Sequence, residues 1–280
     1  MIVYRTKSDL SGHLESLRNS GKTIGLVPTM GALHRGHTSL VEQATKENDV
    51  VVVTVFVNPT QFNDASDLEN YPRTLDADLQ MLQELKADLI FVPAVNEMYP
   101  ENEKRSFNLG NLDKVMEGKQ RKGHFNGVAQ IVTKFFEVVL PTCAYFGQKD
   151  FQQLVVIRRL VELMNLDIAI VACPIIREPD GLAMSSRNVR LSSRERKLAP
   201  FIYTTLNLAR EKRISLSPEE VKLWVTARFE TQSEMDLEYF EIVEDKDLRP
   251  VMDWEEKVNK VGCLAVNLGR VRLIDNMNFD

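Results

Sequence analysis

The sequence contains few cysteines, and their spacing offers no way to link them. Cys143, Cys173 and Cys263 are the only three among 280 residues, and each lies in an apolar stretch far from the others. Disulfide frameworks and zinc sites need an even set of cysteines or closely spaced ligands. The sequence therefore argues against both, and it predicts three buried, reduced thiols that pack as small apolar side chains.

Long hydrophobic runs are also missing. The longest apolar runs, such as VVVVTVFV at residues 50–57, are far shorter than the roughly 20 residues that cross a bilayer. The N-terminal stretch MIVYRTKSDLSGHLESL mixes charged residues with short apolar groups, and it lacks the apolar core of a signal peptide. We therefore expect a cytoplasmic protein that does not bind a membrane.

An excess of positive charge is the third absence. The 35 lysines and arginines are outnumbered by 40 aspartates and glutamates, which gives a formal net charge of −5 at pH 7. Proteins that bind nucleic acids or anionic membranes usually present a broad basic surface. We expect no nucleic-acid partner, and a small polyanion such as ATP would have to bind a local cluster of donors.

The first two-thirds of the chain alternates short β-branched runs with amphipathic stretches, which is typical of strands and helices around a parallel sheet. Continuous apolar strands predict a sheet covered on both faces. The predicted strands are residues 23–28, 49–58, 88–93, 144–147 and 167–176, and the predicted helices are 38–47, 74–86, 127–139 and 151–164.

After Ile176 the pattern changes to a smaller α+β domain. Residues 178–197 are polar and rich in arginine, so we expect a hinge at about residues 177–187. Ser217 followed by Pro218 predicts a helix start, because serine is a good N-cap and proline suits the first helical position. The predicted helices are 194–213 and 217–231, and the predicted strands are 237–244, 263–268 and 270–276, with Gly269 in a hairpin.

Two of only four histidines follow the first predicted strand, within VPTMGALHRGHTSL at residues 27–40. In an open α/β sheet, ligands bind at the carboxyl ends of the strands, where the next helix presents free backbone N–H groups. Gly31 and Gly36 would let the backbone approach a bound group, and His34 and His37 would add donors. The arrangement suits a nucleotide triphosphate.

Two other interpretations of the histidine pair remain at this point. His34 and His37 could bind a metal ion, but no glutamate lies between them as in HExxH, and neither His13 nor His124 has ligand-like spacing around it. They could also be unrelated surface residues. Their position after a strand and beside two glycines favours a ligand site instead.

Three further polar loops point to the same kind of ligand. FGQKDFQQL at 146–154 follows a strand and offers Lys149 as a point charge for phosphate. GLAMSSRN at 181–188 places two hydroxyl groups beside an arginine, which can bind phosphate oxygens. FVNPTQFN at 56–63 supplies neutral amides suited to hydroxyl groups and a carboxylate. Each loop alone could be an ordinary turn or helix start; together they favour a shared function.

These segments resemble the pantothenate synthetase, or pantoate-beta-alanine ligase, family of the HxGH nucleotidyltransferase superfamily. MGALHRGHTSL is similar to the HxGH signature, and MSSR is similar to the KMSKS-type loop that closes over ATP. The resemblance covers residues 24–192 with strong motifs and the remainder more loosely. The motifs that occur in the family's order and spacing are PTMGALHRGH, VFVNPTQFN, YPRT, GHFNGV, FGQKDFQQL and REPDGLAMSSRN.

The resemblance implies ATP-dependent ligation of (R)-pantoate and beta-alanine to pantothenate, a precursor of coenzyme A, through a pantoyl adenylate. It implies a Rossmann-like parallel sheet with helices on both faces in a nucleotide- and pantoate-binding domain, 1–176, and an α+β lid domain, 177–280. It further implies a cytoplasmic homodimer and Mg²⁺ carried by the phosphates of ATP, so that no protein ligand for the metal is expected.

The resemblance also implies roles for individual residues. His34, His37 and Lys149 would be catalytic, with His37 as proton donor, and Gln61 and Gln153 would bind pantoate, with Gln61 also binding beta-alanine. The ATP site would comprise Met30, Gly31, Ala32, Leu33, His34, Arg35, Gly36, His37, Gly147, Gln148, Lys149, Asp150, Ile176, Met184, Ser185, Ser186 and Arg187.

Two positions depart from the family pattern. Gln148 replaces the usual glutamate, which we expect to matter little if only the backbone contacts ATP, and Ile176 replaces a common valine. Three alternatives remain: a nucleotidyltransferase of the same fold that acts on a phosphorylated substrate, a non-catalytic nucleotide-binding protein, and a tRNA synthetase. The last is disfavoured because the chain has no room for an anticodon domain and no broad basic surface.

Overall fold

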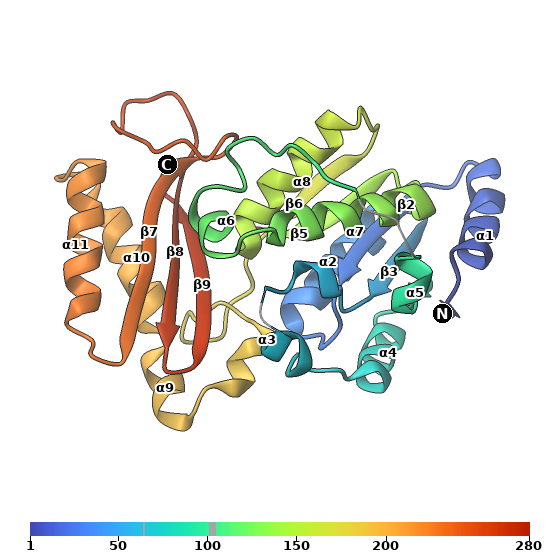
Figure 1. The fold of residues 1–280 in the computed structure, drawn as a ribbon, viewed down its shortest axis with the longest axis horizontal. Helices are drawn as coiled ribbons and strands as arrows, with labels where there is room; N and C mark the ends of the chain where they lie inside the picture. The colour runs from blue at the N-terminus through green and yellow to red at the C-terminus, as the bar shows by residue number, and fades with distance from the viewer. Residues whose placement is uncertain (64, 101–104) are drawn as a thin grey trace. The chain divides into compact units, whose positions relative to one another are not determined.

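Six short apolar segments form a parallel sheet in the computed structural model, which describes residues 1–63, 65–100 and 105–280 (Figure 1). The strand order is β1-β4-β3-β2-β5-β6, and every neighbouring pair is parallel. The strands are β1 (Ile2–Tyr4), β2 (Ile24–Thr29), β3 (Val50–Val55), β4 (Leu89–Phe91), β5 (Cys143–Gly147) and β6 (Ala169–Cys173).

Helices connect these strands and cover the sheet. They are α1 (Lys7–Asn19), α2 (Arg35–Glu47), η1 (Pro59–Gln61), α3 (Ala65–Glu69), α4 (Leu75–Glu84), α5 (Val95–Met98), α6 (Met116–Gln120), α7 (His124–Val139), η2 (Gln148–Asp150) and α8 (Phe151–Leu163). The predicted strand at 49–58 ends at Val55, because Pro59 starts a 3-10 turn soon afterwards, and the predicted helix at 127–139 begins three residues earlier, at His124.

The sheet is buried on both faces, as the sequence predicts. All six residues of β3 are buried, and Val51, Val53 and Val55 pack in one cluster with α2 residues. Successive side chains of a strand point to opposite faces, so Ile90 of β4 belongs to that cluster while Phe91 faces α7, where it contacts the Phe135 ring edge-on. The predicted α/β fold is confirmed.

The strand order creates a switch point between β2 and β5. From β2 the chain continues to the adjacent β3 and then to β4, whereas β5 lies on the other side of β2. In such sheets, ligands bind outside the carboxyl ends of the strands where the order reverses. Here those ends are Thr29 and Gly147, which precede the two loops that the sequence singles out.

The chain divides into two compact units, residues 1–148 with 156–174, and residues 149–155 with 175–280. The second unit has its own antiparallel sheet, β7-β8-β9, with α10 and α11 on one side of it (Figure 1). Its elements are η3 (Ser186–Arg190), α9 (Ser193–Leu198), α10 (Phe201–Lys212), α11 (Pro218–Glu230), β7 (Met235–Glu244), β8 (Lys260–Leu268) and β9 (Val271–Asn278).

Two predictions for the second unit have different outcomes. The hairpin at Gly269 is confirmed, and its φ of 57° explains the glycine. The single helix predicted over 194–213 is wrong: α9 ends at Leu198 and α10 starts at Phe201. Pro200 lies between them, and proline lacks the N–H that would continue the first helix.

The three cysteines are free thiols; Cys173 and Cys263 are buried as predicted, but the prediction is wrong for Cys143, which is partly exposed. Burial raises the pKa of the Cys173 thiol to about 11. In the part of the chain that the structure describes, no helix is long and apolar enough to span a bilayer.

Candidate active site

The loop between β2 and α2 is held by a buried carboxylate from another helix. Gly31 and Ala32 take left-handed backbone conformations, with φ of 80° and 49°, and turn the chain sharply after the strand. The backbone N–H groups of Ala32 and Leu33 then donate to the carboxylate of Asp78 at 2.9 and 2.8 Å. Asp78 is 2% exposed and lies in the first turn of α4. The loop geometry is thus fixed by a residue 45 positions away.

The histidine pair closes the start of α2. His34 is the N-cap, and its Nδ1 atom accepts the Gly36 N–H at 3.1 Å. His37, three residues on, accepts the His34 N–H with its own Nδ1 at 3.4 Å, and the two rings lie 4.1 Å apart between centroids. This is a capping box in which two imidazoles replace the usual serine and glutamate.

The capping box also determines which tautomer each neutral histidine adopts. A ring nitrogen that accepts a backbone N–H cannot carry a proton itself, so in the neutral ring the proton is on Nε2. His34 and His37 therefore each carry an Nε2–H donor when neutral. Two such donors from one helix turn suit the oxygens of a phosphate chain.

Gln61 is positioned by its neighbours at the end of η1. Its Oε1 atom accepts from the Asn58 amide at 3.1 Å, so its Nε2 group is the end that can donate, and at present it lies 2.9 Å from the Met30 sulfur. Its main-chain carbonyl accepts from Nδ1 of His124 at 2.7 Å. The other His124 nitrogen faces the Arg121 guanidinium at 3.1 Å, which fixes the Nδ1–H tautomer because arginine can only donate.

Helix α7 approaches η1 closely. A Cβ at Gly127 would overlap the Thr60 carbonyl oxygen, so only glycine fits there. The Gly127 carbonyl accepts from the Asn58 amide at 3.1 Å. His124, Gly127 and the intervening turn, which form the GHFNGV motif, therefore support the loop that carries Gln61.

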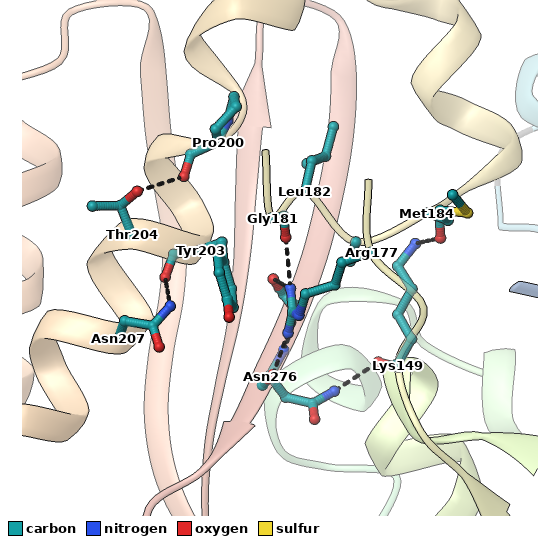
Figure 2. Close-up of polar contacts among 12 residues, drawn as sticks. Lys149, Arg177, Gly181, Leu182, Met184, Pro200, Tyr203, Thr204, Asn207 and Asn276 are labelled. Carbon is teal, nitrogen blue, oxygen red and sulfur yellow. Dashed lines mark hydrogen bonds and ion pairs between the residues drawn. The ribbon is translucent and has the colours of Figure 1, made fainter. Parts of the chain in front are cut away.

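Lys149 lies in the short turn η2 that precedes α8. Its Nζ atom donates to the Met184 carbonyl at 3.1 Å (Figure 2). Although the residue as a whole is partly exposed, protein atoms surround the ammonium group, and this desolvation lowers the pKa of Lys149. The facing carboxylates of Asp150 and Asp275 favour the charged form, and the guanidinium groups of Arg187 and Arg177 oppose it.

The segment from Ile176 to Arg187 is an ordered loop. The Met184 N–H donates to the Ile176 carbonyl at 3.0 Å, and Arg177 and Ala183 form a bridge next to it. Ser185 then caps η3, because its hydroxyl oxygen accepts the Arg187 N–H at 3.2 Å. These backbone contacts thus determine the positions of Ser185, Ser186 and Arg187 in the loop.

Comparison with known proteins decides the family. The profile of the family described as pantoate-beta-alanine ligase matches residues 2–278. The chain belongs to the pantoate-beta-alanine ligase family. It is 52% identical to the pantothenate synthetase of Porphyromonas gingivalis over 280 residues, all of both chains, and 53% identical to that of Bacteroides thetaiotaomicron over all of this chain and 99% of the relative.

Solved structures of the ligase family agree. Pantothenate synthetase from Thermus thermophilus superposes with a TM-score of 0.93 at 42% identity, covering 100% of this chain and 99% of that one. The pantoate-beta-alanine ligase of Francisella tularensis, solved in complex with beta-gamma ATP and beta-alanine, gives 0.82 at 36% identity over 100% and 98%. This ligase is therefore an enzyme of pantothenate formation.

The predicted site residues of the ligase fall in both units. The first unit holds Met30 to His37, Gln61, Gly147 and Gln148, and the second holds Lys149, Asp150, Gln153, Ile176 and Met184 to Arg187. Within the first unit, Gln61 contacts Met30, and within the second, Lys149 contacts Met184. The roles given to these residues remain predictions.

Several residues that support the ligase site were missed from the sequence. Asp78 follows the YPRT motif, and His124 belongs to the GHFNGV motif, so the motifs marked both segments without giving a role. Arg177 is likewise inside REPDG, but its partner Asp275 is 98 residues away and had no signal of its own.

Proposed function

We propose that this ligase makes pantothenate in two steps, through an enzyme-bound pantoyl adenylate. The carboxylate of (R)-pantoate would attack the α-phosphorus of ATP and release pyrophosphate, and the amine of beta-alanine would then displace AMP. The observation that supports this proposal is the histidine capping box, since it puts the proton of each neutral ring on Nε2, and two such donors from one helix turn suit the oxygens of a phosphate chain. The ATP and beta-alanine bound in the Francisella tularensis relative support both as substrates here.

The attack brings two anions together, so the site must offset their repulsion and align them. We propose that His34 and His37 donate hydrogen bonds from Nε2 to the phosphate chain. The further role of His37 as proton donor to the leaving group would need its imidazolium form, in which Nδ1 carries a proton and releases the His34 N–H. Lys149 and Arg187 are proposed to neutralise the charge that builds on the departing pyrophosphate. The Lys149 ammonium has three N–H donors, so it could bind a phosphate oxygen while one N–H stays on the Met184 carbonyl.

The rest of the predicted ATP site is proposed on the same basis. The backbone of Gly147, Gln148 and Ile176 and the side chain of Asp150 would hold the nucleoside part. The Ile176 carbonyl accepts from Met184, so a contact there would be coupled to the loop that carries Ser185 and Ser186. Met30 to Arg35 would line the phosphates beside the histidines.

Gln61 is proposed to bind pantoate and to border beta-alanine, and Gln153 to bind pantoate. Because Asn58 fixes the Oε1 atom of Gln61, the amide presents N–H donors, which suit a carboxylate or a hydroxyl oxygen. Its present acceptor is the sulfur of Met30, a weak acceptor that a carboxylate oxygen would outcompete.

We further propose that Mg²⁺ arrives bound to the phosphates of ATP, where it would supply charge neutralisation. Among residues 1–63, 65–100 and 105–280, no group of three or more His, Cys, Asp or Glu side chains could hold a metal ion, and the candidate donors are imidazoles, amides and cations. Such donors fit phosphate oxygens. The proposal needs no dedicated protein cage for Mg²⁺, because the Mg²⁺ of many ATP-using enzymes is held chiefly by phosphates and water. The resemblance also supports a cytoplasmic homodimer in which residues 177–280 act as a lid that protects the adenylate from water.

Isotope exchange between ATP and pyrophosphate tests the proposal. The ligase should exchange label only when pantoate is present, and it should form pantothenate and AMP once beta-alanine is added. Exchange without pantoate, or exchange with pantoate but no pantothenate after beta-alanine is added, would contradict it. The second result would instead indicate an enzyme that stops at the nucleotidyl product.

A further inference from the structure

Arg177 holds four acceptors of the second unit with one guanidinium group (Figure 2). It makes a two-pronged ion pair with Asp275 of β9, at 2.6 and 3.0 Å. It also donates to the carbonyls of Gly181, at 3.0 Å, and Asn276, at 3.2 Å. Only 18% of the Arg177 side chain and 2% of the Asp275 side chain are exposed, so the pair is shielded from water.

An aromatic ring completes this arrangement. The Arg177 guanidinium lies 4.3 Å from the centre of the Tyr203 ring, a stacking that favours arginine over lysine. Tyr203 also packs against Gly181, where φ is 92° and a Cβ would overlap the ring. The guanidinium therefore has one orientation available, and the loop from Gly181 onward is fixed to it.

Strand β9 reaches Lys149 as well. The amide of Asn276, next to Asp275 in the strand, donates to the Lys149 main-chain carbonyl at 2.9 Å. Consecutive residues of β9 thus fix two things: the base of the 177–187 loop, through Arg177, and the backbone of Lys149 (Figure 2). The Lys149 ammonium and the Met184 carbonyl that it binds belong to these two fixed segments.

We infer that Asp275 and Arg177 are positioning residues for adenylate formation, which set Lys149 and the 181–187 loop in place without touching substrate. The inference rests on the proposed function of Lys149 and Arg187 at the phosphates. Stability alone does not explain the pair, since a buried ion pair is often no better than apolar packing of the same volume. A fixed two-pronged pair does define orientation, and phosphoryl transfer depends on alignment.

The test separates the two half-reactions in Asp275→Asn, which keeps the shape and removes the charge. Exchange of ATP with pyrophosphate should fall by about 100-fold, because a misplacement of about 1 Å can cost that much. Formation of pantothenate from supplied pantoyl adenylate and beta-alanine should change little, because no triphosphate takes part. Arg177→Lys keeps the charge but loses the two-pronged ion pair with Asp275. It should likewise slow exchange much more than the second half-reaction, and it replaces the first variant if that one does not fold.

A matched control lies in the same sheet. Glu238→Gln removes a different ion pair, which Glu238 of β7 forms with Arg272 of β9 at 2.6 Å, and both half-reactions should stay at the wild-type rate. Equal losses in both half-reactions of folded Asp275→Asn, or no loss of exchange, would overturn the inference. Wild-type pantothenate formation in the same series tests the proposed function separately.

The pH dependence of ATP–pyrophosphate exchange gives a second test. If Asp275 had a purely structural role, the pH at which exchange declines on the alkaline side (the alkaline limb) would not change. The charged groups that face Lys149 are Asp150, Asp275, Arg187 and Arg177. Asp275→Asn removes one of the two anions, so Lys149 should lose its proton at a lower pH than in the wild type. The limb should shift to lower pH in Asp275→Asn and stay in place in Glu238→Gln; an unmoved limb in the first variant would contradict the inference.

Discussion

The groups proposed to bind a phosphate chain are held in different ways in the two units. In the first, the proposed donors are the imidazoles of His34 and His37, oriented by hydrogen bonds within one helix turn, while the buried Asp78 carboxylate holds the loop before them. In the second, the proposed donors are the cations Lys149 and Arg187, and the loop near them is held by an ion pair between Arg177 and Asp275.

The difference follows from the cost of burying charge. A neutral donor needs only a hydrogen-bond partner to stay in place, and neighbouring residues of the chain can provide it. A buried cation also needs a nearby anion, or it loses its proton. Both arrangements use a distant carboxylate, but Asp78 in the first holds backbone N–H groups, whereas Asp275 in the second also favours the charged form of Lys149. The two should therefore respond differently to substitution and to pH.

The largest loss of activity is expected when the second unit loses the positive charge of Lys149. Lys149→Met should lower the rate of ATP–pyrophosphate exchange by about 1000-fold, in the range that the loss of one preorganised donor can cost. The fold should persist, since methionine is apolar and similar in length. Lys222→Met, which removes a lysine paired with Glu241 in the same unit, is the control and should leave exchange unchanged. A similar loss in both variants would argue that Lys149 has no special role.

In the first unit, substitutions of His34 can separate its role as helix N-cap from its proposed role as a phosphate donor. Asparagine is a good N-cap but has no imidazole, so His34→Asn should keep stability within about 0.5 kcal/mol while His34→Ala costs about 1 kcal/mol. Both should reduce exchange by about 100-fold, because each removes the Nε2–H donor. Urea unfolding and exchange assays check the two effects. Full activity in His34→Asn would mean that the histidine serves only as a cap.

A smaller effect is expected from the carboxylate behind the same loop. Asp78→Asn weakens two backbone hydrogen bonds to a charged acceptor, so it should cost about 2 kcal/mol of stability. The shifted loop should reduce exchange by about tenfold. Asp76→Asn changes an exposed aspartate in the same helix turn and should affect neither quantity. If exchange is preserved in a destabilised Asp78→Asn, the carboxylate stabilises the loop without positioning the histidines.

The same contrast explains how much could be predicted from the sequence. The parallel sheet and the loop after β2 were predictable because they depend on local patterns: apolar runs such as residues 50–55, and a glycine before a histidine pair at a strand end. The break at Pro200 was also readable in principle, since proline inside a helical pattern interrupts it.

Other features depend on contacts between distant residues. The strand Ile2–Tyr4 is only three residues long and pairs at the sheet edge, which leaves little periodicity to detect. Asp275 looks like any strand aspartate until the fold brings it to Arg177. His124 was noted for its motif but not its role, because its contact with the Gln61 carbonyl joins residues 63 positions apart.

The smallest effect concerns pH, and it separates the two kinds of donor within the intact site. Desolvation lowers the pKa of Lys149 below the ordinary 10.5, so its positive charge is lost as pH rises through that lowered value. Exchange should therefore decline on the alkaline side at a pH below 10.5, while neutral imidazoles lose nothing there. Lys149→Arg keeps its charge at every accessible pH because a guanidinium stays protonated throughout that range, so this variant, although slower, should show no alkaline decline. A pH profile of exchange in both proteins measures this, and a decline that persists in Lys149→Arg would assign the limb to another group.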